Sequence, residues 1–224
     1  MKVELFQMER MQSMYERVVD YEFSESGVHP LKLNELLEDE KATETFLDSS
    51  LGYPHADGTP SLRNAVASTY AGATMENVFV TNGSSEANFI AAWHLLEEGD
   101  EIVLMTPNYA QMWGLAKTWD VKIKQLHLRE DAGWQFDAED LKSLVTKKTK
   151  VIQVCNPNTP TGAIMAGEQR KALMGASRDS GAWLLSDEVY LGAERDAPLT
   201  QSLWSDYEKT LITNGLSKAY GLPG

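Results

Sequence analysis

From residue 78 onward, short apolar runs alternate with segments of helical periodicity. The runs span residues 78–81, 101–105, 121–128, 151–155, 183–186 and 210–213. Apolar runs of strand length separated by helices are typical of βαβ units, whose strands lie parallel and whose helices cover the sheet. A chain of 224 residues with 42% hydrophobic side chains is long enough to bury one such domain. We therefore expect an α/β fold with a mainly parallel sheet sandwiched by helices.

The N-terminal region has a different pattern. Leu5, Met8 and Met11 recur at helical spacing, and the pattern continues to Val18. It predicts an amphipathic helix over residues 4–20, followed by an extended polar stretch. We expect this region to be a packing arm.

Charge and cysteine content disfavour several classes of protein. The net charge of −13 argues against a nucleic-acid-binding surface, because such a surface needs clustered Lys and Arg to displace counterions from phosphates. The single cysteine, Cys155, has no disulfide partner within the chain, which fits a reducing compartment. The N-terminus lacks an apolar signal core, and no run approaches the roughly 18 apolar residues of a membrane span. We expect a cytoplasmic protein that binds neither nucleic acid nor membrane.

The segment Thr81-Asn82-Gly83-Ser84-Ser85-Glu86 follows one predicted strand and opens a predicted helix. The unpaired amides of a helix N-terminus and the helix dipole favour an anion, and Gly83 permits close approach. The segment lacks a Walker lysine and a G-x-G-x-x-G pattern, which disfavours ordinary nucleotide cradles. A phosphate suits this junction, but serines at a helix start are more often plain N-caps, so the segment alone is a weak signal.

Three further motifs follow predicted strands. A loop with two prolines and a glycine, residues 156–162, follows one strand, Asp187 ends another, and Lys218 follows the last. Ligands of open α/β sheets bind at the carboxyl ends of the strands, and Asp187 needs a cationic partner if it is buried. Taken singly, Lys218 is better explained as a surface lysine and Asp187 as a capping aspartate.

In this order the four motifs resemble the class I/II aminotransferases, fold-type I enzymes that depend on pyridoxal 5′-phosphate (PLP). The matching segments are the small-residue phosphate loop, N-P-x-x-P-T-G, D-E-V-Y and S-K-A-Y-G-L-P-G, and residues 52–63 are similar to the family's Y-x-x-x-x-G-x-x-x-L-R stretch. The resemblance implies a seven-stranded-type, mainly parallel sheet. It places a PLP-binding large domain at residues 46–224, and an arm with part of a small domain at residues 1–45.

The resemblance also implies roles for single residues. Lys218 would bind the cofactor as a Schiff base and then act as a general base. Asp187 would keep the pyridine nitrogen protonated, so that the ring can accept the electrons of a carbanion. Tyr190 would donate to the cofactor's phenolic oxygen. Tyr109 would stack on the ring, although an aromatic residue that opens a helix is also ordinary core material.

The resemblance assigns the cofactor phosphate to Gly83, Ser84, Ser85 and Ser217. Tyr53 would reach the phosphate bound by the neighbouring subunit, so the resemblance implies a homodimer with active sites at the interface. It implies no metal site.

The sequence departs from the family pattern at Thr159, where the family has an asparagine that donates to the phenolic oxygen. The threonine hydroxyl would donate with shorter reach. Residues 217–224 stop without a closing helix or strand, so we expect a large domain truncated at its C-terminal end. The small C-terminal domain and the family's arginines for the cofactor phosphate and the substrate carboxylate would then lie past Gly224.

The function favoured by these motifs is amino-group transfer between an amino acid and a 2-oxo acid. An alternative keeps PLP and Lys218 but ends in elimination, cyclisation or oxidation. Residues 26–30 weakly resemble relatives that cyclise or oxidise arginine-derived amino acids, but an unbound loop histidine explains His29 better. Two further alternatives are a non-catalytic ligand sensor on the same fold and a plain nucleotide-binding α/β protein. The sequence does not identify the amino acid.

Overall fold

A six-stranded sheet forms the centre of the computed structural model, which describes residues 3–37, 39–195 and 198–223. The strand order is β3-β2-β1-β4-β5-β6. Neighbouring strands are parallel except β2 and β3, which are antiparallel. The expected α/β fold with a mainly parallel sheet is confirmed. The strands are β1 (Glu101–Thr106), β2 (Lys122–Arg129), β3 (Gln135–Phe136), β4 (Thr149–Cys155), β5 (Trp183–Asp187) and β6 (Thr210–Thr213).

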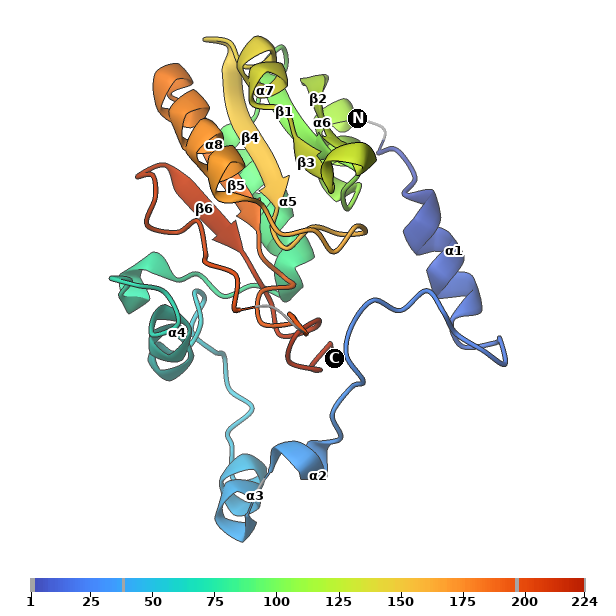
Figure 1. Cartoon of the computed structure of the whole chain (residues 1–224). Coiled ribbons are helices and arrows are strands. Elements are labelled where there is room, and N and C mark those ends of the chain that lie inside the picture. Colours follow the sequence, from blue (N-terminus) through green and yellow to red (C-terminus); the bar gives the residue numbers. More distant parts are fainter. Residues whose placement is uncertain (1–2, 38, 196–197, 224) are drawn as a thin grey trace.

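Helices cover both faces of this sheet (Figure 1). The helical elements of the described residues are α1 (Gln7–Tyr15), α2 (Leu33–Leu36), α3 (Glu40–Leu47), α4 (Pro60–Ala67), α5 (Gly83–Leu95), α6 (Gln111–Thr118), α7 (Ala138–Leu144), α8 (Gly167–Ser180) and the 3₁₀ turns η1 (Met75–Asn77) and η2 (Glu130–Ala132). Along β1, Ile102 and Leu104 pack in an apolar cluster with α5 and α6. Val103 and Met105 pack in a second cluster with α7 and α8. Successive side chains of a strand point to opposite faces, so β1 is apolar throughout because both of its faces are buried.

Two segments of the sheet region differ from the expectation. Residues 78–81 form no strand, and the Val80 N–H donates at 3.0 Å to Asp57 O, in a loop. An extended segment becomes a strand only when a neighbour exchanges hydrogen bonds with it, and within the described residues no strand lies beyond β6. The sheet therefore has six strands rather than the seven that the resemblance implies. The sequence does not predict β3, because a strand of two residues carries no periodic signal.

The N-terminal arm lies outside these layers. Helix α1 is shorter than the expected 4–20, and no described residue before Arg63 is buried. Without a core to pack against, the first residues of the amphipathic pattern do not extend the helix, since short helices depend on tertiary packing. Figure 1 shows α2 and α3 projecting away from the sheet. One contact with the sheet domain is aromatic: the Phe6 ring meets Tyr109 edge-on, with the ring centroids 5.1 Å apart.

Candidate functional site

The loops that follow β4, β5 and β6 open at one edge of the sheet. These strands are parallel, so their carboxyl ends lie together. Register pairs Cys155 with Asp187 and Asp187 with Thr213, and the three loops therefore begin side by side. This edge carries residues 156–162, Asp187 and the loop with Lys218.

Asp187 is buried at the end of β5, with 4% of its surface exposed. Its Oδ1 accepts from the Val189 backbone N–H at 3.2 Å, and no Lys, Arg or His of the described residues forms a salt bridge with it. Burial penalises the charged form and raises the pKa of Asp187 to about 6. A buried carboxylate without a cation is costly, so this position suits a cationic ligand.

Tyr109 lies near Asp187 and the start of α5. Burial raises the pKa of the Tyr109 phenol to about 12, and the nearby Ser85 side chain opposes this rise. The charges of Glu9 and Asp187 raise the same pKa further. The structure therefore brings Tyr109, Ser85 and Asp187 into one neighbourhood, with Glu9 contributed by the arm.

The first turn of α5 offers the backbone N–H groups of Ser84 and Ser85, to which no side chain of the described residues is bonded, whereas the Gly83 N–H donates to Thr81 O at 2.9 Å. The N-cap residue Asn82 makes no side-chain cap hydrogen bond. Gly83 has φ +78°, in the left-handed region that favours glycine, and no other residue lies within 4 Å of a Cβ built there. Ser84 is half-buried and Ser85 is exposed. An open helix N-terminus with two hydroxyl groups suits an anion such as phosphate.

Lys218 lies in the loop after β6, and this loop approaches the start of α5. A Cβ built on Gly215 would lie 3.9 Å from the Ser84 nitrogen. The Lys218 Nζ forms an ion pair with Glu25 Oε1 at 3.1 Å, and 30% of its side chain is exposed. Ser217, the preceding residue, is half-buried. The amine is therefore reachable, and a carboxylate of the arm pairs with it.

Residues 24–31, which we call the strap, cross the same edge. Tyr190 donates its hydroxyl proton to Ser26 Oγ at 2.7 Å. A backbone N–H of the strap donates to Glu25 and lowers the pKa of its carboxyl group more than the ion pair with Lys218 does. The Glu25 carboxylate therefore stays ionised. The sequence does not single out Glu25 or Ser26, because a polar stretch without periodicity gives no sign of what it touches.

Two backbone hydrogen bonds fix the strap in place. Val28 N–H donates to Lys218 O at 3.1 Å, and Leu31 N–H donates to Gly221 O at 2.9 Å. Gly221 has φ +66°, and a Cβ built there would lie 2.9 Å from His29 O. A side chain at Gly221 would therefore both strain the backbone and push the strap away. His29 contributes its carbonyl group to this junction.

Two expected site residues stand apart from these contacts. Thr159 is half-buried in the loop after β4, and its hydroxyl forms no hydrogen bond within the described part of the chain. Tyr53 is fully exposed. The roles of Thr159 and Tyr53 stay predictions, the latter because its expected partner is another subunit.

Buried side-chain amides join the loops of the site, and sequence reasoning missed them. Asn158 donates to Pro107 O at 3.2 Å, which ties the loop after β4 to the loop after β1. Asn88 is buried on α5, one turn before the buried Ala92. An amide on the apolar face of a helix is the sequence signal that would have found Asn88.

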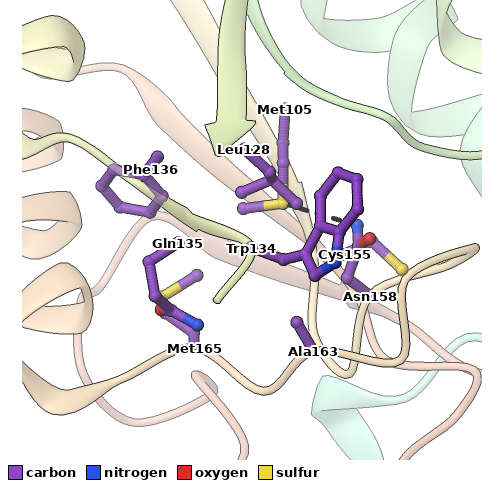
Figure 2. A pocket seen from close by; sticks show the side chains of 9 residues that line it. All are labelled: Met105, Leu128, Trp134, Gln135, Phe136, Cys155, Asn158, Ala163 and Met165. Atoms are coloured by element: carbon purple, nitrogen blue, oxygen red, sulfur yellow. Dashed lines mark hydrogen bonds between the residues drawn. The ribbon is translucent and has the colours of Figure 1, made fainter. Parts of the chain in front are cut away.

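A small cavity lies beside the site. Figure 2 shows side chains that line it, among them Met105, Trp134 and Cys155. Its volume of about 10 Å³ has room for roughly one water molecule, and none of the expected cofactor residues lines it. A wider hollow, lined by Trp204 and Thr210 among others, lies at the opposite end of β6. The candidate site is therefore the open carboxyl edge of the sheet rather than either hollow.

Metal and membrane signals are absent from the described residues. No three His, Cys, Asp or Glu side chains among them come together in a way that would hold a metal ion. None of their helices has both the length and the apolar character needed to span a bilayer. Cys155 is buried and forms no disulfide there, and burial raises the pKa of its thiol.

Comparison with known proteins relates most of the chain to one family. The sequence model for "Aminotransferase class I and II" matches residues 28–224. A glutamate-pyruvate aminotransferase of Haemophilus influenzae is 34% identical over 187 residues, which are 80% of this chain and 46% of the relative. Capreomycidine synthase of Streptomyces vinaceus is 32% identical over 213 residues, which are 91% of this chain and 53% of the relative. The chain thus spans about half the length of these curated relatives.

Solved structures agree with the sequence comparison. A PLP-dependent aminotransferase from Streptococcus suis 89-1591 superposes with a TM-score of 0.92 at 30% identity, over 100% of this chain and 61% of the other. The PLP-dependent cyclase OrfR superposes with a TM-score of 0.85 at 26% identity, over 100% of this chain and 59% of the other. Both activities therefore occur among proteins of similar fold.

Proposed function

Because the chain belongs to the class I and II aminotransferase family, we propose that it is part of an enzyme that moves an amino group between an amino acid and a 2-oxo acid. The family and its PLP-dependent relatives imply PLP as the cofactor. The observation that carries the proposal is the buried Asp187 carboxylate, which has no cationic partner among the described residues and lies at the sheet edge that also carries Lys218.

The residues at this edge fit PLP. A protonated pyridine nitrogen is the cation that the buried Asp187 lacks. The uncapped first turn of α5, with Gly83, Ser84 and Ser85, provides donors for a phosphate, and Ser217 approaches from the loop after β6. When bound, PLP supplies an electron sink for negative charge at the substrate α-carbon.

Lys218 performs the covalent and proton-transfer work in this proposal. Its amine would hold PLP covalently and, when free, could move a proton at the substrate α-carbon. The ion pair with Glu25 would have to open before the amine could bind PLP, because a protonated amine has no lone pair to donate. Glu25 then keeps an ionised carboxylate beside the reacting nitrogen.

The other side chains bind and orient. Asp187 holds the proton on the ring nitrogen, because a neighbouring negative charge favours the protonated ring. Tyr190, whose hydroxyl now bonds Ser26 Oγ, would donate to the cofactor's phenolic oxygen, with Thr159 as a second donor. Tyr109 stacks on the ring face.

A homodimer with active sites at its interface is part of the proposal. Tyr53 is fully exposed, as expected for a residue that reaches the partner's phosphate site. On α5, Phe89, Ile90 and Trp93 are exposed, and an apolar patch of this kind is typical of a surface covered by another chain. Sedimentation of the intact protein tests this assembly, and a monomer at working concentration would contradict it. We also propose a cytoplasmic location, consistent with one buried cysteine and no disulfide.

Borohydride reduction tests the central assignment. The PLP-loaded protein should absorb visible light, lose that absorbance on reduction, and yield a peptide with a pyridoxyl group on Lys218. Lys209, which bonds Gly181 O at 3.1 Å on another part of the surface, is the internal control and should stay unlabelled. Label at Lys209, or at no lysine, would overturn the proposal.

A second candidate is PLP-dependent cyclisation or another lyase or oxidase reaction on an amino acid. The similarity to capreomycidine synthase over 91% of this chain favours it specifically. The two functions differ in their need for an amino acceptor. Amine transfer that requires an added 2-oxo acid supports the aminotransferase, whereas a product formed from the amino acid alone supports the alternative.

A further inference from the structure

The strap holds one carboxylate close to the Lys218 amine. Glu25 Oε1 accepts from the Gly27 backbone N–H at 2.6 Å and from Lys218 Nζ at 3.1 Å. A Cβ built on Gly27 would lie 3.3 Å from Ser217 O and 3.5 Å from Lys218 Cδ. Because Gly27 has no side chain, the strap passes close enough to the lysine for this contact. Figure 1 shows this part of the arm running past the C-terminal end of the chain.

The Glu25 ion pair is not what fixes the strap in place. Backbone hydrogen bonds from Val28 to Lys218 O and from Leu31 to Gly221 O hold the strap without any side-chain charge. The Glu25 side chain is 52% exposed, and an ion pair exposed to that degree contributes little to stability. A role in folding therefore does not explain a carboxylate at this position, and its place beside a functional amine points to a ligand.

Lys218 is the one cation that pairs with Glu25 in the part of the chain that the structure describes. In the proposed function this pair is temporary, because the lysine nitrogen bonds to PLP and then no longer offers the N–H donors of an ammonium group. The Gly27 N–H keeps the pKa of Glu25 low, so its carboxylate stays charged when the lysine leaves. An ionised, half-exposed carboxylate then lies at the site without a cation.

An amino acid substrate brings the missing cation. In amino-group transfer its nitrogen must reach the cofactor carbon to which the lysine nitrogen is bound, since the two nitrogens exchange at that carbon. Glu25 Oε1 lies 3.1 Å from the lysine nitrogen, so the carboxylate is placed to receive an ammonium group that approaches the lysine. A 2-oxo acid has no ammonium group and makes no such contact.

We propose that Glu25 is a substrate-binding residue, whose carboxylate receives the α-ammonium group of the amino acid when Lys218 holds the cofactor and pairs with Lys218 again when that amine is released. The catalytic meaning of this inference rests on the proposed function. The binding of an external ammonium group by Glu25 does not rest on it, because such binding requires only the strap and the absence of the lysine amine. The two statements can therefore be tested separately.

The first measurement tests the binding of an external ammonium group in the full, cofactor-free Lys218→Ala chain. The chain carries ¹³C-labelled glutamate and is titrated with ethylammonium chloride against sodium chloride. The carboxyl signal that Glu25→Gln removes should shift and saturate at about ten millimolar, the range expected for one ion pair open to solvent. The signal of Glu22, whose carboxylate bonds Ser24 in the same exposed segment, is the control and should not shift. An unshifted Glu25 signal would overturn the inference.

The second measurement follows each half-reaction of the PLP-loaded, full-length protein separately by single-turnover absorbance. The probes are the uncharged amino acid that the parent converts fastest, beginning with L-alanine, and the matching 2-oxo acid. Glu25→Gln should raise the apparent dissociation constant of the amino acid about tenfold, the effect of one charge-assisted hydrogen bond, and leave that of the 2-oxo acid unchanged. Glu22→Gln removes an equal charge and should change neither value. Gly27→Ala, whose Cβ would lie 3.0 Å from Glu25 Oε1, should act like Glu25→Gln but more weakly.

The asymmetry between the two substrates decides the outcome. Equal changes for the amino acid and the 2-oxo acid, or no change for either, would overturn the inference. A loss confined to arginine and lysine would also overturn it, because Glu25 would then bind a cationic side chain rather than the α-ammonium group. If the parent converts no amino acid, the proposed function fails, yet the ethylammonium titration still decides whether Glu25 binds an ammonium group.

Discussion

A buried carboxylate lies at each end of the parallel sheet, and its surroundings differ completely between the two ends. At the amino end, Glu101 begins β1 and is met by Lys124 Nζ at 2.5 Å, Thr146 Oγ1 at 2.6 Å and Lys122 Nζ at 3.3 Å. These contacts lower the pKa of Glu101 to about 2, and the hydrogen bond from Lys124 has the largest effect. At the carboxyl end, Asp187 has no such cation among the described residues, and burial raises its pKa to about 6.

The difference separates a structural end of the sheet from a functional end. Glu101 has its partners within the chain, so its charge contributes to folding. Asp187 keeps an unfavourable charge at the edge where ligands of parallel sheets bind. A buried charge that no described residue compensates indicates that a ligand completes the site. The comparison predicts that changes at one end alter activity and changes at the other alter stability.

The largest expected effect is that of Asp187→Asn. A neutral amide cannot hold the ring nitrogen protonated, so turnover of the PLP-loaded enzyme should fall by about a thousandfold. The variant should fold at least as well as the parent without cofactor, because a buried charge is removed. Steady-state kinetics and chemical denaturation measure both. Near-normal turnover would remove Asp187 from this role and contradict the assignment of the carboxyl end of the sheet as the functional end.

At the other end, Glu101→Gln should destabilise the fold by about 2 kcal/mol. The buried Lys124 loses its carboxylate partner, which lowers stability. The loss is smaller than for a fully buried pair, because the cluster is exposed to solvent at Lys122. PLP binding by the folded variant should stay at the parent's level. Urea denaturation tests this against Glu130→Gln, a change in the exposed turn η2. Equal stability of the two variants would contradict the structural role of Glu101.

The two carboxylates should also give stability opposite dependence on pH in the cofactor-free protein. The folded pKa of Glu101 is lowered, so its contribution is present above about pH 4.5 and is lost as the pH falls toward about 2. The folded pKa of Asp187 is raised from 3.8 to about 6, so its carboxyl group destabilises the fold progressively as the pH rises from 3.8 to about 6, and the cost stays constant above that. Denaturation of the parent, Asp187→Asn and Glu101→Gln across this range separates the two slopes. Parallel slopes would show that the two environments do not differ.

The smallest expected effect concerns Thr159, at the carboxyl end. If its hydroxyl donates to the cofactor's phenolic oxygen, Thr159→Asn should lower the pKa of the bound chromophore, and Thr159→Val should raise it. Each change corresponds to about 1 kcal/mol, the contribution of one hydrogen bond. Absorbance titration measures both. The parent's pKa in both variants would make Thr159 a structural residue of the loop.

The sequence predicts the fold more completely than the site. The apolar runs 101–105, 151–155 and 210–213 become strands, because strand length and apolar content are local properties of a buried parallel sheet. Residues 78–81 have the same texture but form no strand, since pairing requires a neighbour that lies elsewhere in the chain. The amphipathic pattern of residues 4–20 likewise predicts a helix but not its observed length, because that length depends on packing against a core that the arm lacks.

Within the candidate site, the order of motifs predicts Asp187 and Lys218 from the sequence alone. A residue at the end of an apolar strand can be identified from its own neighbours in the sequence. Only the tertiary structure decided their surroundings: Asp187 is buried at the end of β5, and Glu25 pairs with Lys218. Glu25 and Lys218 are separated by 193 positions along the chain. Contacts over such separations depend on sheet register and the path of the loops, and the charge state of Asp187 depends on burial that no local pattern encodes.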